Sequence, residues 1–579
     1  MPTLDTLIQQ YMDNQAALGA AIAILQGGDI VYTGGFGITS VEDGGVKVTP
    51  QTLFAYGSIT KNICSVLIMR LVEKERLHLD TPIVHYLPDF QFRQNEEYSR
   101  KVTLRHLLSH TSGLPMAGKY WGPRDPDSLR RSVYEQVAHY TFLAEPGAVH
   151  LYSNMVFCVA GHVAEAVTGR FYDDLVQEYV LEPLQMTRTT FDLSVAMTYP
   201  IALPHESGPD GQPRLVHRLP YNASGHPSSF ALGPASDLGN LARMYLNQGR
   251  VDEQQFLTAA AVAEMQRLHA SLHIASAAHP LAHPNGGFGL GFNVGHYKGR
   301  RVVRHGGMNP GYNCFFDLFP DDRAGVVLLT TYLPGHEQQL MELVATLYDY
   351  TLALPREGIV FLDKPAAISL DTDQLPRYGG TYLNIDRANL VTFVVAGDKL
   401  ILERGEDTLP LVAIGNNEFY AEVSERYRLS VAFSFNSDGM VIHVMVGGQP
   451  YHPIKLDLAF EPDLRLWQSF VGVYKDPSNM DKADILMVRL ENGVLYIAEG
   501  DHEVPGKAID NNCFLSDLGL IEFEESESDT VKVLVRGKAT QYYPLKEKEY
   551  RANSVIQYLV DVPQRLGDVP VVQQQVQST

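Results

Sequence analysis

The pattern of hydrophobic and polar positions divides the chain into a mixed part and an all-β part. In the first part, strand-like apolar runs lie near residues 20–32 and 288–331, at its two ends. Between them, apolar residues recur at helical spacing over 58–74, 154–169 and 236–268. This order predicts an α/β (α+β) domain whose first and last strands share one antiparallel sheet flanked by helices.

Two further helices are predicted near the ends of this domain, which we place at residues 1–355. Residues 3–16 form an amphipathic pattern that Thr3 or Asp5 opens, and a second helical pattern covers 336–353. The last strands of the sheet are expected at 288–296, 301–306, 312–319 and 324–331.

Beyond this domain the pattern changes to short alternating strands. Residues 356–374 carry Pro365 and several Asp, which predicts a linker. A weak internal repeat then predicts two tandem β-barrel-like domains, at 375–460 and 461–562, before a flexible tail at 563–579. Chance similarity between two strand-rich segments is the alternative. The matching segments are Tyr378-Gly379-Gly380-Thr381-Tyr382 with Phe470-Val471-Gly472-Val473-Tyr474, and Tyr451-His452-Pro453 with Tyr542-Tyr543-Pro544.

A serine and a lysine open the helix predicted at 58–74. Turn-prone Gly57 precedes Ser58, and Lys61 follows one helical turn later on the same face. A serine hydroxyl becomes a nucleophile when a base takes its proton, and an amine can do this if its pKa is lowered. Burial and the positive N-terminus of a helix both lower the pKa of a lysine. Ser58 and Lys61 are therefore candidate catalytic residues, although this spacing also arises by chance in a chain of such length.

A tyrosine and an asparagine open the helix that is predicted to end near residue 169. The phenol of Tyr152 can relay a proton, and the amide of Asn154 can bind Lys61 or a substrate carbonyl. The same Tyr-x-Asn spacing also begins at Tyr245 and at Tyr382, so the motif alone is weak.

A histidine and two glycines lie at the end of the apolar strand predicted at 301–306. His305-Gly306-Gly307 precedes Met308, and the two glycines allow a substrate backbone to approach the strand closely. A lone histidine is more often structural, but its place beside two glycines favours a binding site. Motifs of rival chemistries, such as G-x-S-x-G, H-E-x-x-H, a Walker loop or G-x-G-x-x-G, do not occur in the sequence.

Composition and charge limit the classes of partner. The formal net charge of -21 argues against a nucleic-acid surface and against docking on anionic membranes. The four cysteines form no C-x-x-C pair, so the sequence predicts neither a metal site nor a cofactor. The first residues lack a signal-peptide pattern, and no apolar run is long enough to span a bilayer. We therefore expect a cytoplasmic protein, unless an export signal lies outside this sequence.

In chain order, these three motifs resemble those of the serine β-lactamase and penicillin-binding-protein superfamily. The branch that they resemble most contains class C β-lactamases, family VIII esterases and D-aminopeptidases. The resemblance covers about residues 3–353, and the two all-β units resemble, more weakly, the lipocalin-like barrels of D-aminopeptidases. The supporting segments are Leu107-Leu108-Ser109-His110-Thr111-Ser112-Gly113-Leu114-Pro115, Gly233-Pro234-Ala235-Ser236-Asp237-Leu238 and Gly289-Leu290-Gly291-Phe292.

The resemblance implies a role for each motif residue. Ser58 Oγ would attack a carbonyl to form an acyl-enzyme, Lys61 would help to deprotonate it, and Tyr152 would protonate the leaving group. The resemblance leaves open which of Lys61 and Tyr152 is the general base. It further implies that Asn154 orients the Lys61 amine or a substrate amide, and that the backbone N–H groups of Ser58 and Met308 form an oxyanion hole.

The third motif departs from the Lys-Thr-Gly or Lys-Ser-Gly of most β-lactamases. His305 is mostly neutral at pH 7, and Gly306 has no hydroxyl, so both weaken recognition of an anionic substrate. We expect a serine hydrolase of small esters or amides, either an esterase or a D-aminopeptidase-like enzyme that takes small molecules or short peptides. A β-lactamase, an acyltransferase and a non-catalytic binding protein remain alternatives. The all-β units would limit substrate size, or would serve stability or a homo-oligomer instead.

Overall fold

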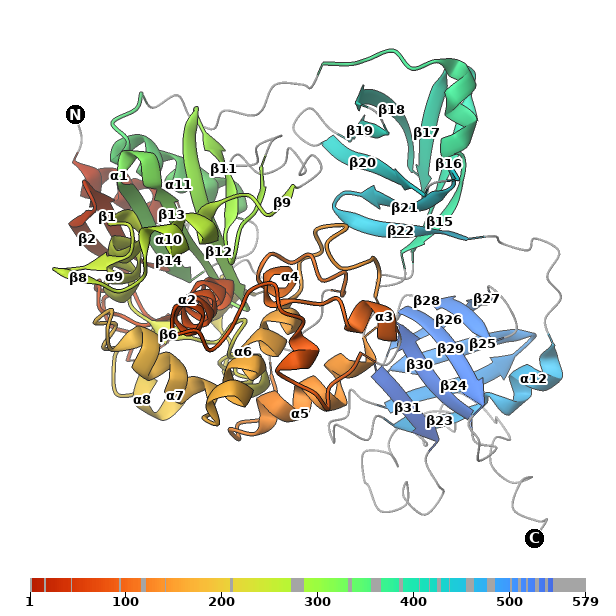
Figure 1. The fold of residues 1–579 in the computed structure, drawn as a ribbon, viewed down its shortest axis with the longest axis horizontal. Helices are drawn as coiled ribbons and strands as arrows, with labels where there is room; N and C mark the ends of the chain where they lie inside the picture. Colours follow the sequence, from red (N-terminus) through yellow and green to blue (C-terminus); the bar gives the residue numbers. More distant parts are fainter. Residues whose placement is uncertain are drawn as a thin grey trace, which may run out of the picture. The chain divides into compact units, whose positions relative to one another are not determined.

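The computed structural model describes the chain from residue 3 to residue 544 (Figure 1). The predicted tail at 563–579, the end of the second predicted barrel domain and residues 356–365 of the predicted linker lie outside the described residues. Within the described range, the gaps are 15–16, 43, 93–94, 116–120, 141, 209–211, 272–285, 332–335, 356–365, 385–388, 406, 416, 424–427, 437, 455–462, 476–484, 500–501, 509–511, 517–518, 526–530 and 537–539.

The first domain is built on an eight-stranded sheet in the order β2-β1-β14-β13-β12-β11-β10-β9. Its strands are β1 (Gly19–Gln26), β2 (Asp29–Gly37), β9 (Ala270–Ser271), β10 (Gly287–Phe288), β11 (Asn293–Tyr297), β12 (Arg300–Asn309), β13 (Tyr312–Phe319) and β14 (Ala324–Thr331), and a separate small hairpin holds β7 (Arg250–Val251) and β8 (Gln254–Gln255). Its helices include η1 (Gly57–Ile59), α1 (Leu4–Asp13), α2 (Thr60–Glu73), α3 (Glu96–Ser99), α4 (Leu104–Leu108), α5 (Ser128–Glu135), α6 (Asn154–Thr168), α7 (Tyr172–Val176), α8 (Leu193–Ala196), α9 (Ala235–Leu246), α10 (Ala259–Gln266) and α11 (Glu337–Thr351). Because β1 pairs with β14 in antiparallel register, the prediction that the first and last strands share one antiparallel sheet is confirmed.

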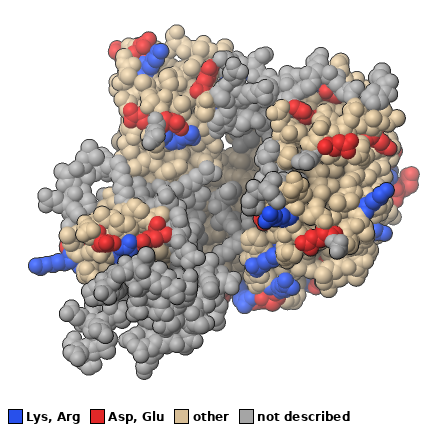
Figure 2. All heavy atoms as spheres, turned by 180° about the vertical axis from the view of Figure 1, so that it is seen from behind, with Lys and Arg blue, Asp and Glu red and all other residues tan. Residues whose placement is uncertain are grey.

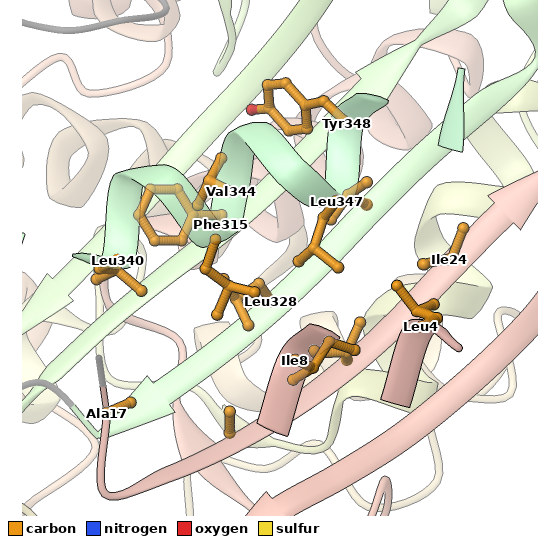
Figure 3. Packing of buried hydrophobic residues seen from close by; sticks show 14 of the residues in the cluster. Leu4, Ile8, Ala17, Ile24, Phe315, Leu328, Leu340, Val344, Leu347 and Tyr348 are labelled. Carbon is orange, nitrogen blue, oxygen red and sulfur yellow. The ribbon is translucent and has the colours of Figure 1, made fainter. Parts of the chain in front are cut away.

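Helices cover both faces of this sheet. On one face, Leu4 of α1 and Leu347 of α11 pack in one buried cluster with Ile24 of β1 (Figure 3). Successive side chains of a strand point to opposite sides, so Ala23 faces away from Ile24. On this other face, Gly239 of α9 lies against Ala23. β1 is therefore buried along almost its whole length, as expected for a central strand covered on both faces.

Two predicted elements differ from the structure. The helical pattern over 236–268 is two helices, α9 and α10, with the β7–β8 hairpin between them. α9 ends at Leu246, and Gly249 in the turn that follows has a φ of 84°, where a Cβ would lie 1.9 Å from the carbonyl oxygen of Leu257. The strand predicted at 301–306 continues as β12 through the third motif to Asn309, so this motif lies inside a strand.

The strand-rich part begins with a closed barrel of eight strands that follow one another around it. The first strand, β15, pairs with the last, β22, and so closes the barrel. Aromatic rings fill its interior, where Phe433 packs against Tyr378, Phe393 and Phe419. The expected all-β domain is thus present. Its strands are β15 (Gly380–Asn384), β16 (Asn389–Ala396), β17 (Lys399–Arg404), β18 (Asp407–Gly415), β19 (Glu418–Glu422), β20 (Arg428–Phe435), β21 (Val441–Val446) and β22 (Gln449–Ile454).

A second set of nine strands follows helix α12 (Leu464–Ser469), in the order β26-β25-β24-β23-β31-β30-β29-β28-β27. Tyr382 of β15 pairs with Pro453 of β22, and Tyr474 of β23 pairs with Pro544 of β31. The weak repeat in the sequence therefore corresponds to the same pairing of first and last strands, while the exact domain boundaries stay predictions. The strands are β23 (Gly472–Lys475), β24 (Ile485–Glu491), β25 (Val494–Glu499), β26 (His502–Pro505), β27 (Lys507–Ala508), β28 (Cys513–Ser516), β29 (Gly519–Glu525), β30 (Val531–Arg536) and β31 (Thr540–Pro544).

The described surface carries both signs of charge. Figure 2 shows Lys and Arg side chains interspersed with Asp and Glu on one face. In the described part of the chain, none of the helices has both the length and the apolar character that crossing a bilayer requires. Nor do three or more His, Cys, Asp or Glu side chains gather as a metal site among the described residues.

Candidate active site

Ser58 lies in the short helix η1, directly before α2. Gly57 holds the preceding turn with a φ of 55°, and a Cβ at this position would lie 2.6 Å from the backbone nitrogen of Met308. Only glycine therefore allows η1 to approach β12 so closely. The side chain of Ser58 is half-buried, so its hydroxyl stands at the start of a buried helix, as the sequence predicts.

Lys61 is fully buried one turn after Ser58, and its exposed fraction is 0%. Its Nζ donates hydrogen bonds to Asn154 Oδ1 at 2.7 Å and to the carbonyl oxygen of Ser228 at 2.9 Å. The same nitrogen lies 3.0 Å from Ser58 Oγ. Burial lowers the pKa of Lys61 to about 7. A neutral amine has two N–H bonds, and the two acceptors use both, so its lone pair remains for the Ser58 hydroxyl.

Tyr152 lies beside this amine, at the residue that precedes the N-cap of α6. The Lys61 Nζ is 4.9 Å from the centroid of the Tyr152 ring, and the ring of His110 is 4.3 Å from it on centroids. The amide of Asn154, at the first residue of α6, completes the contact with Lys61. The first two predicted motifs therefore meet at one amine.

His305 lies on β12 with its side chain buried and its ring centroid 6.1 Å from that of Tyr152. Its Nδ1 lies 2.7 Å from the carbonyl oxygen of Gly306 and must donate, since a carbonyl oxygen only accepts. Burial, together with the charge of Lys61, lowers the pKa of His305 to about 3. The imidazole is therefore uncharged at neutral pH and offers no cation to a substrate.

The third motif also forms a strand edge beside the serine. In the described part of the chain, the ladder between β11 and β12 ends at Arg304, whereas β13 pairs with β12 up to Asn309. A Cβ on Gly307 would lie 1.9 Å from the carbonyl oxygen of Tyr56, so this glycine permits the close packing of β12 against η1. The part of β12 that follows His305 therefore has an edge beside η1, the helix that carries Ser58.

The comparison with protein families decides the identity of this domain. The model of the family described as Beta-lactamase matches residues 4–348, which is more than half of the chain. The chain belongs to the beta-lactamase family. The resemblance inferred from the three motifs is thereby confirmed.

Two curated proteins and two solved structures illustrate what this beta-lactamase family member is similar to. Protein flp of Staphylococcus aureus (strain MW2) is 26% identical over 345 residues, which is 58% of this chain but only 64% of that protein. Penicillin-binding protein 4 of Amycolatopsis lactamdurans is 29% identical over 54% of this chain and 80% of its own length. The structure of SurE shares the fold with a TM-score of 0.62 and 24% identity, over 78% of this chain and 98% of SurE. SurE with D-Leu gives a TM-score of 0.58 over 78% of this chain.

Activity of this beta-lactamase family member is expected to rise with pH through about 7. Lys61 is a base only when neutral, so kcat/KM for an uncharged ester should fall about tenfold per pH unit below the Lys61 pKa and level off above it. The pKa of His305 is about 3 and that of His150 about 4, so neither histidine titrates in this range. A profile that stays flat from pH 5 to pH 9 contradicts the assignment of Lys61.

The two glycines of the third motif should differ sharply in their tolerance of a methyl group. Gly307→Ala forces a side chain against the Tyr56 carbonyl, and we expect it to lower the free energy of unfolding by about 1–3 kcal/mol and to reduce activity. Gly306→Ala is the matched control, because the nearest atom to a Cβ there is Cys314 O at 3.8 Å. Denaturant unfolding and ester turnover of both variants test this, and equal behaviour counts against the observed packing.

Two groups at the site were not predicted from the sequence. The carbonyl oxygen of Ser228 accepts a hydrogen bond from Lys61, but a backbone oxygen carries no signal in the residue type. His110 packs on Tyr152, and although it lies in one of the segments that support the resemblance, its spacing indicates no role.

Proposed function

We propose that the chain is a serine hydrolase that cleaves small esters or amides through an acyl-enzyme on Ser58. The observation that supports this most is the set of contacts around the Lys61 amine. With both N–H bonds of the neutral amine directed at oxygen acceptors, its lone pair is available to Ser58 Oγ, 3.0 Å away. A base with a pKa of about 7 is well matched to catalysis near neutral pH.

In the proposed reaction, Lys61 takes the proton of Ser58 as the bond between Oγ and the carbonyl carbon forms. Tyr152 gives a proton to the leaving alcohol or amine as its bond to this carbon breaks, and it regains a proton from the Lys61 ammonium. Water then attacks the carbonyl carbon of the acyl-enzyme and gives its proton to the same pair. The bond between this carbon and Ser58 Oγ breaks, Oγ takes the proton back from the pair, and the acid is released. The backbone N–H groups of Ser58 and Met308 would hold the oxyanion, and each such donor stabilises the transition state by about 3–4 kcal/mol.

The proposed substrate has no carboxylate next to the scissile bond. Three features of β12 support this: His305 is uncharged, Gly306 has no hydroxyl, and Met308 presents an apolar side chain that is 59% exposed. A carboxylate would lose its water shell without gaining a cation or a hydroxyl from these three residues. Uncharged esters and amides, including esters and amides of D-amino acids, fit this edge better than β-lactams.

A substrate panel tests the proposed function. We expect kcat/KM for p-nitrophenyl acetate and for D-alanine and D-leucine p-nitroanilides to exceed that for nitrocefin, which carries a carboxylate, by at least about a hundredfold. D-leucine is included because SurE has been solved with D-Leu. L-alanine p-nitroanilide measures stereochemical preference, and Ser58→Ala gives the background rate for each substrate. Nitrocefin turnover as efficient as ester turnover overturns the proposed substrate class.

The cytoplasmic location, the formation of a homo-oligomer and the role of the two all-β parts stay predictions.

A further inference from the structure

His110 contacts the chain on both sides of Tyr152. Its carbonyl oxygen accepts a hydrogen bond from the backbone N–H of Leu151 at 2.7 Å. Its ring nitrogen Nδ1 accepts a second one from the backbone N–H of Ser153 at 3.1 Å. The ring itself lies 4.3 Å from that of Tyr152 on centroids, with 37° between their planes. One residue therefore fixes the backbone before and after the tyrosine and also one face of its ring.

The backbone of His110 is in a conformation that its residue type does not favour. It follows α4 with a φ of 56°, a left-handed region that glycine and asparagine adopt more readily. Glycine would relieve this strain but would remove the acceptor for Ser153. Residues held in such conformations are concentrated at functional sites, where the surrounding contacts maintain them.

The side chain of His110 is also suited to accept a hydrogen bond permanently. It is fully buried, and burial together with His150, Lys61 and His305 keeps its pKa well below the ordinary range. The ring is therefore neutral, with its proton on Nε2 and a lone pair on Nδ1 for the N–H of Ser153.

We propose that His110 is a positioning residue that holds the phenol of Tyr152 where it can protonate the leaving group. This inference rests on the proposed function, in which Tyr152 is the proton donor. A shift of about 1 Å in a positioned group can reduce a rate by about a hundredfold, so two hydrogen bonds beside Tyr152 are enough to matter. The hydrogen bond to Nδ1 is the contact that a change of side chain can remove.

A positioning role and a purely structural role predict different dependence on the leaving group. p-Nitrophenolate leaves without a proton, whereas the alkoxide of an ethyl ester requires one. Loss of the Tyr152 position should therefore slow ethyl ester hydrolysis far more than p-nitrophenyl ester hydrolysis. A loss of folded protein lowers both rates by the same factor and also lowers labelling by a fluorophosphonate probe, whose fluoride leaves without a proton.

Two substitutions of His110 separate its hydrogen bond to Ser153 from the packing of its ring on Tyr152. His110→Asn retains an acceptor oxygen near the position of Nδ1 and tolerates a positive φ, but it lacks the ring. His110→Phe retains the ring and lacks the acceptor. We expect His110→Phe to reduce kcat for an ethyl ester at least about a hundredfold and for a p-nitrophenyl ester less than about tenfold, while His110→Asn stays within about tenfold for both.

Further variants keep the test decisive. His110→Gly removes the acceptor without backbone strain and replaces His110→Phe if the latter does not fold. His205→Phe is a matched control, because buried His205 also accepts a backbone N–H, from Val41 at 3.3 Å, and should change both esters by one common factor. A uniform loss in His110→Phe, or an equal selective loss in His110→Asn, overturns the positioning role. Failure of the unmodified protein to hydrolyse either ester overturns the proposed function instead.

Discussion

Ester turnover is expected to fall about 10⁴- to 10⁶-fold when Ser58 is replaced by alanine. The substitution removes the one oxygen that lies 3.0 Å from the Lys61 amine, and water alone cannot take its place in an acyl-enzyme reaction. Since the side chain is half-buried and small, we expect little change in the free energy of unfolding. The measurement is kcat/KM with p-nitrophenyl acetate, together with covalent labelling by a fluorophosphonate probe.

A second serine on the same helix gives a matched control for this result. Ser65 is buried in α2, and its Oγ has no hydrogen-bond partner among the described residues. Ser65→Ala therefore removes a hydroxyl from the same helix without removing a described bond, and it should keep both turnover and labelling. Persistent labelling in Ser58→Ala, or its loss in Ser65→Ala, contradicts the assignment of the nucleophile.

Replacing Lys61 by methionine is expected to reduce kcat about 10²- to 10⁴-fold, which is the usual contribution of a positioned acid or base. Methionine has a similar length and is apolar, so it suits a fully buried position. The oxygens of Asn154 and Ser228 lose their shared donor, so some loss of stability accompanies the loss of activity. The rise of the remaining activity with pH through about 7 should also disappear.

The control for this prediction is Lys74→Met, which removes an exposed amine at the C-cap of the same helix. Its pH profile and kcat should match those of the unmodified protein. If Lys61→Met retains both its rate and its dependence on pH, another group is the base, and Tyr152 becomes the first candidate.

Local patterns in the sequence were sufficient to predict most helices and strands of the first domain and to locate the three motifs. Ser58 and Lys61 are separated by one helical turn, so their proximity follows from the helix itself. The meeting of Lys61 with Ser228 could not be predicted, because these residues are 167 positions apart and the contact uses a backbone oxygen. The extent of β12 was also underestimated, since strand propensity gives no reason for two glycines to continue a strand, whereas the pairing with β13 does.

The all-β parts show what a weak pattern can and cannot establish. The repeated tyrosine and proline positions predicted two similar units, and the pairing of Tyr382 with Pro453 and of Tyr474 with Pro544 explains the repeat. The interior of the first barrel depends on aromatic packing between distant strands, such as Phe393 on Phe433, which no short window of sequence contains.

The most direct test of the account is the mass of the protein while it turns over an ester. A steady-state reaction with p-nitrophenyl acetate, quenched in acid, should contain protein that is heavier by one acetyl group, and peptide mapping should place this group on Ser58. The account predicts this adduct in the unmodified protein and its absence in Ser58→Ala. Two results together would contradict it: the unmodified protein turns over the ester but shows no adduct on Ser58 at any time of quenching, and Ser58→Ala also turns over the ester.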